Sequence, residues 1–443
     1  MTDALREPGK RGVWARHRRA LSWSAGALVV LGAGILPLVL HLRNAPKALL
    51  LRLDLETSKS LWATQGDPWH QAGMSRLSQL FRLNPAALAV QENRVGVERS
   101  VTIDLAGRGK AAVVVHTVSS SRPGVTLWEG VVTGSQRSSV TLVRSESSVA
   151  GDIWLGDTLY EIQPWAQDIY SIEILEQGTA PREAPPRRQP PTKSKKRADL
   201  PSSSCAAETV AVLVLYTNET QYVLGDAGIQ VRAALAEHET NVAFANSGIR
   251  HRIRVVGIKH VHFTSTENME GDLDRLASGQ LDSVLLWRDS TNADVVSLWT
   301  GPSMYQGFEA AGLGNLIADP PEGAARAFFV VQWKWATGYY SFGHELGHIL
   351  GADHDHADAD NSTPPARPFA YGYQDPSSGF RDIMSYDCTP SCPRVQYFST
   401  PNVLLSGRPV GTSYTANPSL AADAADTFDE TACSVAQYHR VKL

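Results

Sequence analysis

Residues 344–354 read His-Glu-Leu-Gly-His-Ile-Leu-Gly-Ala-Asp-His, and this stretch decides how the second half of the chain is interpreted. His344 and His348 are four positions apart, so on a helix they share one face with Cβ atoms about 5–6 Å apart. Gly351 is expected to end that helix, because glycine readily takes the left-handed conformation at a C-terminal cap. The chain then turns back, and His354 can approach the same point. We therefore predict three imidazoles directed at one ion.

These ligands indicate a catalytic zinc ion. Neutral imidazoles suit Zn²⁺ better than Mg²⁺ or Ca²⁺, which prefer oxygen, and three protein ligands leave a fourth position open, as in catalytic zinc sites. Glu345 follows the first ligand and is displaced around the helix axis, where it can act as a general base towards water. His356 could compete as the third ligand, but the spacing from Gly351 favours His354. We predict one Zn²⁺ on His344, His348 and His354, with Glu345 as the catalytic base.

The stretch from His344 to Asp355 resembles the metzincin zinc endopeptidases, and its final Asp is like that of the adamalysin (reprolysin) branch. Residues 382–386, Asp-Ile-Met-Ser-Tyr, resemble the metzincin Met-turn. Residues 336–343 and 392–401 are similar to bacterial peptidyl-Asp metalloendopeptidases, and the resemblance covers about residues 205–433. It implies an α+β metzincin catalytic domain, with a twisted mixed sheet, helices and a loop-rich lower lobe. It also implies peptide or protein substrates.

The same resemblance implies roles for residues around the metal. Met384 would form an apolar floor beneath the three histidines, and Asp355 would anchor the segment after His354 through hydrogen bonds. Tyr386 would either stabilise the oxyanion or ligate zinc, as in some metzincins, or it would be a packed tyrosine below the cleft. Trp335 stands where a cysteine is expected, so one family disulfide is missing. Cleavage beside aspartate belongs to few members and is not carried over.

The N-terminus indicates export. Residues 1–20 form a basic, cytoplasmic n-region, and residues 21–42 contain an uncharged apolar run that serves as a signal or anchor. Twenty uncharged residues, Leu21 to Leu40, are enough to span a bilayer. Whether this segment is cleaved stays open. In both cases the N-terminal segment contacts the membrane, and the rest is secreted or anchored outside the cytoplasm.

The middle of the chain indicates a small antiparallel β-rich prodomain followed by a linker. Residues 43–177 carry short period-2 runs separated by turn residues. Residues 178–204 are rich in proline and basic residues without apolar periodicity, which is typical of a linker. Cleavage near Lys195-Lys196-Arg197 would mature a zymogen, although a plain solvated spacer fits equally well. No cysteine precedes Cys205, so latency must come from another ligand or from occlusion of the cleft.

Residues 205–443 are expected to form the peptidase domain. We predict strands at 209–216, 252–258, 293–299 and 327–333, helices at 229–244, 273–285 and 339–350, and a mostly irregular stretch at 352–433.

The four cysteines favour two disulfides and an oxidising compartment. They allow three connectivities, of which Cys388–Cys392 with Cys205–Cys433 is our working assumption. A net charge of −4 gives no reason to expect a nucleic-acid partner. The competing interpretation is a membrane-anchored binding or adhesion protein with an inert zinc site. Glu345 argues against it, because an inert site needs only the histidines.

Overall fold

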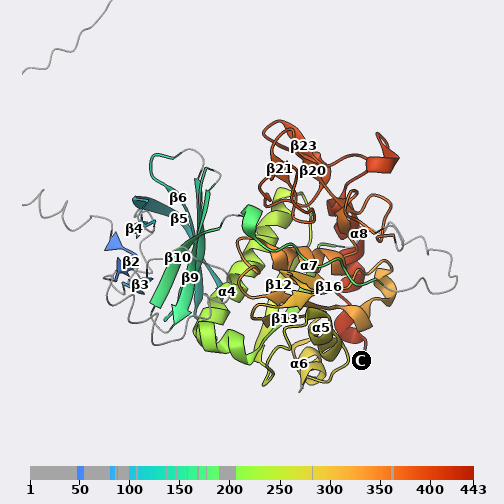
Figure 1. Cartoon of the computed structure of the whole chain (residues 1–443), viewed down its shortest axis with the longest axis horizontal. Coiled ribbons are helices and arrows are strands. Elements are labelled where there is room, and N and C mark those ends of the chain that lie inside the picture. Colours follow the sequence, from blue (N-terminus) through green and yellow to red (C-terminus); the bar gives the residue numbers. More distant parts are fainter. Residues whose placement is uncertain are drawn as a thin grey trace, which may run out of the picture. The chain divides into compact units, whose positions relative to one another are not determined.

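In the computed structural model, residues 46–443 form one compact unit (Figure 1). The predicted n-region and the apolar run at 21–42 lie outside the described residues. Among the helices that the structure does describe, none combines the length and apolar character needed to cross a membrane. The described residues run from 47 to 443, except 54–79, 85–86, 88–98, 106–107, 136–137, 146, 157, 167–168, 176, 189–205, 282 and 361–363.

The N-terminal β-rich part is a single ten-stranded sheet. All its neighbouring strands are antiparallel except the parallel pair β1 and β4. Alternating side chains bury one apolar face, which includes Trp128, Ile153 and Ile162. In sheet order the strands are β1 (Lys47–Ala48), β4 (Arg99–Asp104), β5 (Lys110–Arg122), β6 (Val125–Val132), β7 (Ser138–Arg144), β8 (Val149–Leu155), β9 (Thr158–Ala166), β10 (Ile169–Leu175), β3 (Leu80–Leu83) and β2 (Leu50–Arg52).

The second sheet is mixed, as predicted. Its order is β12 (Arg252–His260), β11 (Thr209–Tyr216), β13 (Val295–Thr300), β17 (Phe328–Gln332) and β16 (Gly312–Gly314). The first four strands are parallel, and β16 pairs antiparallel with β17 at one edge. Every residue of β13 and β17 is buried, which explains their continuous apolar sequence. The edge strand β16 lies beside the site described below.

Helices cover this sheet (Figure 1). The predicted helix at 229–244 lies inside α4 (Asn218–Asn246), and the predicted helix at 339–350 corresponds to α7 (Ser341–Ile349). The single helix predicted at 273–285 is wrong, because α5 (Met269–Ala277) and α6 (Val284–Thr291) are separate. Gly279 takes a φ of 70° between them. A left-handed glycine ends a helix, so the apolar spacing alone was misleading.

Residues 352–433 are rich in loops and short strands, as predicted, with one exception. Residues Ala424–Val435 form helix α8, whose Asp423 cap accepts a hydrogen bond from the Asp426 amide. The remaining strands are β14 (Met304–Tyr305), β15 (Phe308–Glu309), β18 (Asp353–Asp355), β19 (Tyr371–Gly372), β20 (Gln374–Asp375), β21 (Phe380–Arg381), β22 (Thr400–Leu405) and β23 (Arg408–Val410).

The cysteine assignment is confirmed in part. Cys388 and Cys392 form a disulfide that closes a short loop after the Met-turn. Cys433 is also disulfide-bonded, and its assumed partner Cys205 lies outside the described residues.

Helix α4 also packs against the N-terminal sheet. Val231, Ala234 and Leu235 of the helix share a buried cluster with side chains of β6, β7 and β8. A buried ion pair of 3.1 Å joins Arg232 of α4 to Glu161 of β9. The two sheets therefore rest on opposite sides of one helix, through apolar burial and a charge pair.

Candidate active site

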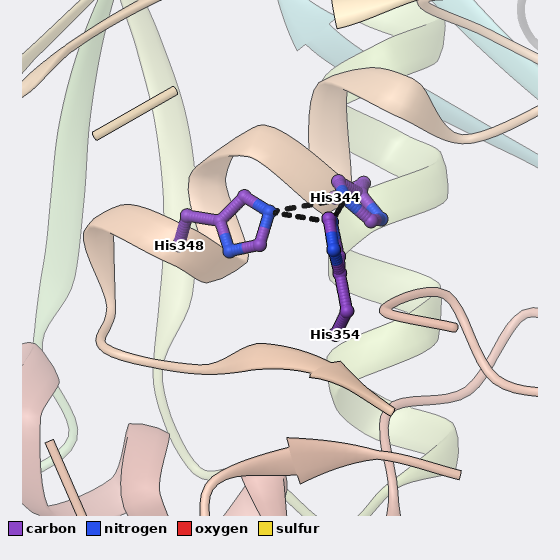
Figure 2. Close-up of side chains that lie close together, drawn as sticks. All are labelled: His344, His348 and His354. Carbon is purple, nitrogen blue, oxygen red and sulfur yellow. Dashed lines mark hydrogen bonds between the residues drawn. The ribbon is translucent and has the colours of Figure 1, made fainter. Parts of the chain in front are cut away.

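Three histidine side chains converge on one point, as Figure 2 shows. His344 and His348 project from the same face of α7, with their Nε2 atoms 3.1 Å apart. Gly351 has a φ of 97°, and a Cβ there would collide with Ala366. The turn at Gly351 leads into β18, from which His354 places its Nε2 3.1 Å from that of His344 and 3.2 Å from that of His348.

The hydrogen bonds of these rings prepare them for a metal. Nδ1 of His344 lies 2.8 Å from the carbonyl oxygen of Ile383, and Nδ1 of His348 lies 2.8 Å from that of Ala352. A carbonyl can only accept, so each Nδ1 carries the proton and each Nε2 presents a lone pair. Burial lowers the pKa of His344 to about 4, and burial also holds the pKa values of His348 and His354 well below the usual value. All three rings are therefore neutral near pH 7.

The triangle of nitrogens fits a zinc ion. Its sides are 3.1–3.2 Å, a spacing at which His344, His348 and His354 could all hold one ion at the Zn–N distance of about 2.0–2.1 Å. His356 is not part of the cluster. Its Nε2 lies 2.8 Å from the carbonyl oxygen of Ala421, and its ring stacks on Tyr371. The structure thus favours His354 as the third ligand.

Glu345 lies between the zinc helix and the edge strand β16. A Cβ on Gly312 would stand 2.5 Å from its Oε1, and a Cβ on Gly314 would stand 2.8 Å from its Oε2. The two glycines therefore leave the room that the carboxylate occupies. Burial, and then the nearby Glu183 carboxylate, raise the pKa of Glu345, which favours a group that takes up a proton.

The segment below the histidines occupies the place predicted for the Met-turn. Met384 is fully buried, and a Cβ on Gly347 of α7 would collide with its Sδ. Asp355 accepts hydrogen bonds from the Tyr386 amide at 3.2 Å and from Gln374 Nε2 at 3.1 Å. These bonds join the segment after His354 to residues 374 and 386, and the anchoring role of Asp355 stays a prediction.

Tyr386 lies at the metal cluster but has a partner that the sequence did not suggest. Its ring centroid is 4.1 Å from that of His354, and its hydroxyl donates to the backbone carbonyl of Glu183 at 2.8 Å. Burial raises the pKa of Tyr386, so its phenol stays a hydrogen-bond donor at neutral pH.

Residues 182–188, which we call the strap, pair with the edge strand next to the histidines. The Ala311 amide donates to Arg182 at 3.0 Å, and the Ala184 amide donates to Gly312 at 2.8 Å. Further along, Arg187 bridges to Asn315 in the parallel direction. The strap belongs to the stretch predicted as a linker, and its remainder from 189 lies outside the described residues. Extended peptides bind proteins by pairing with exposed edge strands, and here the chain's own residues 182–188 take that position beside β16.

Glu183 is held by the most buried ion pair of the strap. Its two carboxylate oxygens accept from both terminal nitrogens of Arg394 at 2.6 and 2.8 Å. The Ser341 hydroxyl, at the start of α7, donates to the same carboxylate at 2.8 Å. Burial by itself would raise the pKa of Glu183, but Arg394 more than offsets this and holds the pKa below its usual range. Both side chains are fully buried.

Sequence reasoning did not identify Glu183, Arg394 or Ser341. The one local signal is the pair Pro185-Pro186, which favours an extended backbone. Nothing in the sequence indicates which strand that extended segment would pair with.

The comparisons with known proteins agree with this geometry. Residues 206–399 match the Reprolysin_5 model, described as metallo-peptidase family M12. A peptidyl-Asp metalloendopeptidase of Stenotrophomonas maltophilia is 31% identical over 364 residues, which cover 75% of this chain and 84% of that protein. Its counterpart in Xanthomonas campestris pv. campestris is 34% identical over 289 residues, which cover 63% of this chain and 66% of that one.

Solved structures match more loosely. The metalloproteinase-II of Bacteroides fragilis has 13% identity and a TM-score of 0.38, and the match covers 58% of this chain and 82% of that one. A likeness this loose adds nothing to the family assignment.

Proposed function

The chain belongs to metallo-peptidase family M12 and is a zinc metalloendopeptidase, and we propose that it is exported, made in a latent form, and uses Glu345 as its general base. The observation that carries the mechanism is the position of Glu345. It follows a metal ligand on α7 and lies against β16, the strand along which an extended peptide would pair.

The residues divide the chemistry as follows. When bound to the three histidines, zinc supplies a Lewis acid that polarises the scissile carbonyl and lowers the pKa of water towards about 7. Glu345 takes the proton of the attacking water and delivers it to the leaving amine. The Tyr386 phenol donates a hydrogen bond to the oxygen that develops negative charge, in the place where it now donates to Glu183. Met384 and Asp355 hold the ligands in position.

The substrate class follows from the relatives. Both proteins compared above are called peptidyl-Asp metalloendopeptidases. We propose that this chain also cleaves peptide bonds next to an acidic residue.

Latency and export have separate support. The histidines and Glu345 are fully buried, and the strap pairs with the strand that a substrate would use. We therefore propose that residues 43–177 act as a prodomain and that cleavage after the strap, near Lys195-Lys196-Arg197, begins maturation. The Cys388–Cys392 disulfide and the predicted signal or anchor at 21–42 fit a destination outside the cytoplasm.

The test of the mechanism is Glu345→Gln in the full chain, assayed on casein after zinc loading. Removing the base should lower the rate by about 10²–10⁴-fold while zinc stays at one per chain by elemental analysis. Glu208→Gln, at a half-exposed position just before β11, is the matched control and should keep full activity. If the Glu345 variant binds zinc and cleaves casein as fast as the control, the mechanism is wrong. If the unaltered chain does not cleave casein even after trypsin has cut it near Lys195-Lys196-Arg197 and has then been inhibited, the adhesion interpretation is favoured.

A further inference from the structure

Arg394 is a buried cation whose carboxylate partner comes from the strap. Among the ion pairs of the described residues, it pairs with Glu183 alone. The guanidinium of Arg394 also donates to the backbone carbonyls of Tyr339 at 3.0 Å and Ser385 at 3.2 Å, and it stacks on the Tyr339 ring at 4.2 Å. These contacts belong to the catalytic domain, so they fix the guanidinium whether or not the strap is present. Removal of Glu183 would leave a buried charge without a counterion, which is strongly unfavourable.

The pocket of Arg394 adjoins the groups that carry out the reaction. Ser341, which also binds the Glu183 carboxylate, lies one helical turn before His344 and Glu345. The carbonyl of Glu183 meets the Tyr386 phenol. The next residue of the strap, Ala184, donates to Gly312, against which Glu345 lies. If a substrate paired with β16 in the place of the strap, the substrate residue at the position of Glu183 would direct its side chain towards Arg394.

The pocket has the chemistry of a carboxylate site. A guanidinium fork and a carboxylate make two parallel hydrogen bonds, and such pairs are among the strongest and most directional in proteins. A buried site built for two charge-assisted bonds rejects an amide of the same shape, because the guanidinium would lose its counterion.

We propose that Arg394 selects an acidic side chain next to the scissile bond, and that Glu183 fills the Arg394 pocket as a built-in substitute for the substrate. The proposal deepens the proposed function and rests on it. Glu183 keeps the site closed for the same reason that an acidic substrate binds there. Maturation replaces the carboxylate of the strap with that of the substrate.

The other strap contacts hold the segment without entering this pocket. Arg188 donates from one terminal nitrogen, Nη2, to both carboxylate oxygens of Asp353 at 2.7 and 2.8 Å. Arg187 pairs with Asp274 at 2.6 Å, but the Asp274 side chain is 69% exposed. Exposed ion pairs contribute little to stability. Breaking the Arg187–Asp274 pair is therefore a control for the loss of one ion pair that involves the strap.

The first test measures substrate selectivity in the zinc-loaded full chain. Quenched fluorescent peptides differ only by Asp, Glu or Asn at one position, and the ratio of kcat/KM for Asp over Asn is compared. Only the fraction of molecules with the strap open can bind a peptide, and this fraction lowers kcat/KM for both peptides by the same factor. The ratio therefore does not depend on latency. The unaltered chain should prefer Asp by at least about 100-fold. Arg394→Gln should reduce the ratio below about fivefold, and Arg394→Lys should give an intermediate value.

Arg381→Gln is the matched control for the first test. Arg381 is equally buried and neighbours Arg394, but it donates to the backbone carbonyls of Cys392 and Ser385 and has no bond to Glu183. The Asp-over-Asn ratio of kcat/KM for Arg381→Gln should stay within about threefold of that of the unaltered chain, since Arg381 makes no charge-assisted bond to the bound carboxylate. If Arg394→Gln binds zinc, melts normally and keeps the full ratio, the proposal is overturned.

The second test needs neither activity nor an Arg394 variant. Trypsin cleavage after Arg187 is followed by mass spectrometry in a Glu345→Gln background, which prevents self-cleavage. Protection of this bond reports how often the strap opens. Glu183→Gln should speed cleavage by at least about tenfold, because it leaves Arg394 buried and unpaired. Asp274→Asn, which removes the exposed ion pair with Arg187, should change the rate of trypsin cleavage by less than about threefold.

The outcomes distinguish failure of the Arg394–Glu183 inference from failure of the proposed endopeptidase function. If Glu183→Gln leaves the strap as protected as before, Glu183 does not close the site and the inference is wrong. If the unaltered chain cleaves the Asp, Glu and Asn peptides equally, Arg394 does not set specificity, although the endopeptidase function stands. If none of the peptides is cleaved even after trypsin has cut the chain near Lys195-Lys196-Arg197 and has then been inhibited, the proposed function fails. The protection of the bond after Arg187 still decides whether Glu183 holds the strap.

Discussion

Replacing Gly347 with alanine tests whether Met384 presses directly on the zinc helix. Glycine inside a helix costs about 1 kcal/mol relative to alanine, so the substitution would ordinarily stabilise α7. Here the new Cβ would collide with Met384 Sδ and stand 3.2 Å from its Cε and 3.4 Å from Phe428 Cζ. Overpacking of a well-filled core costs about 1–3 kcal/mol, which outweighs the gain in propensity. The net effect should be a loss of up to about 2 kcal/mol.

Gly343 is a control within the same helix. A Cβ there would meet Thr240 Oγ1 at 3.3 Å, and its other contacts are at 3.8 Å or more. Alanine at 343 should therefore keep most of the gain in propensity, about 1 kcal/mol. The two substitutions make the same chemical change in one buried helix and differ mainly in the side chain below.

The assay is thermal unfolding of the zinc-loaded and zinc-free protein, together with a zinc titration. For a domain of this size, about 1 kcal/mol corresponds to a shift of about 2–4 °C, so Gly347→Ala should melt lower by several degrees and Gly343→Ala should not. Pressure on Met384 also moves Ile383, whose carbonyl orients His344, so zinc affinity should fall about 10–100-fold. If Gly347→Ala is as stable as Gly343→Ala, Met384 does not press directly on α7.

Three further outcomes are expected. Gly312→Ala should lower the turnover rate by about 100-fold while zinc is retained, because the new Cβ would displace Glu345 by about 1 Å. Gly271→Ala is the control: its Cβ would make only ordinary contacts in α5, so the turnover rate should not change. Burial raises the pKa of Asp152 from 3.8 to about 6, so this carboxyl stabilises the fold below pH 3.8 and loses that contribution as pH rises through 6. Asp152→Asn should therefore raise the melting temperature more at pH 7.5 than at pH 4.5. His354→Ala should abolish tight zinc binding in a competition titration, since two imidazoles remain.

Local spacing by itself determines the metal cluster. The helical period places His344 and His348 on one face, and Gly351 supplies the left-handed turn that returns the chain to His354. The continuous apolar runs of β11, β13 and β17 were equally readable, because buried parallel strands need apolar side chains on both faces.

Local patterns failed where a short-range signal conflicted with tertiary contacts. The run at 273–285 has helical spacing, yet Gly279 divides it. Helix α8 was missed because its sequence is rich in Ala, Asp and Thr, and its apolar face is defined by burial of residues such as Phe428 and Val435.

Only the tertiary structure showed that Glu183 of the strap pairs with Arg394. Glu183 and Arg394 are 211 positions apart, and neither carries a local pattern that predicts its partner. Their pairing depends on the path that brings the strap along β16 and on the loop that carries Arg394 past the Met-turn. The sequence determined the metal ligands because helical geometry fixes residues a few positions apart. It did not determine which side chain would pair with Arg394, because an ion pair between distant segments exists only once the whole chain has folded.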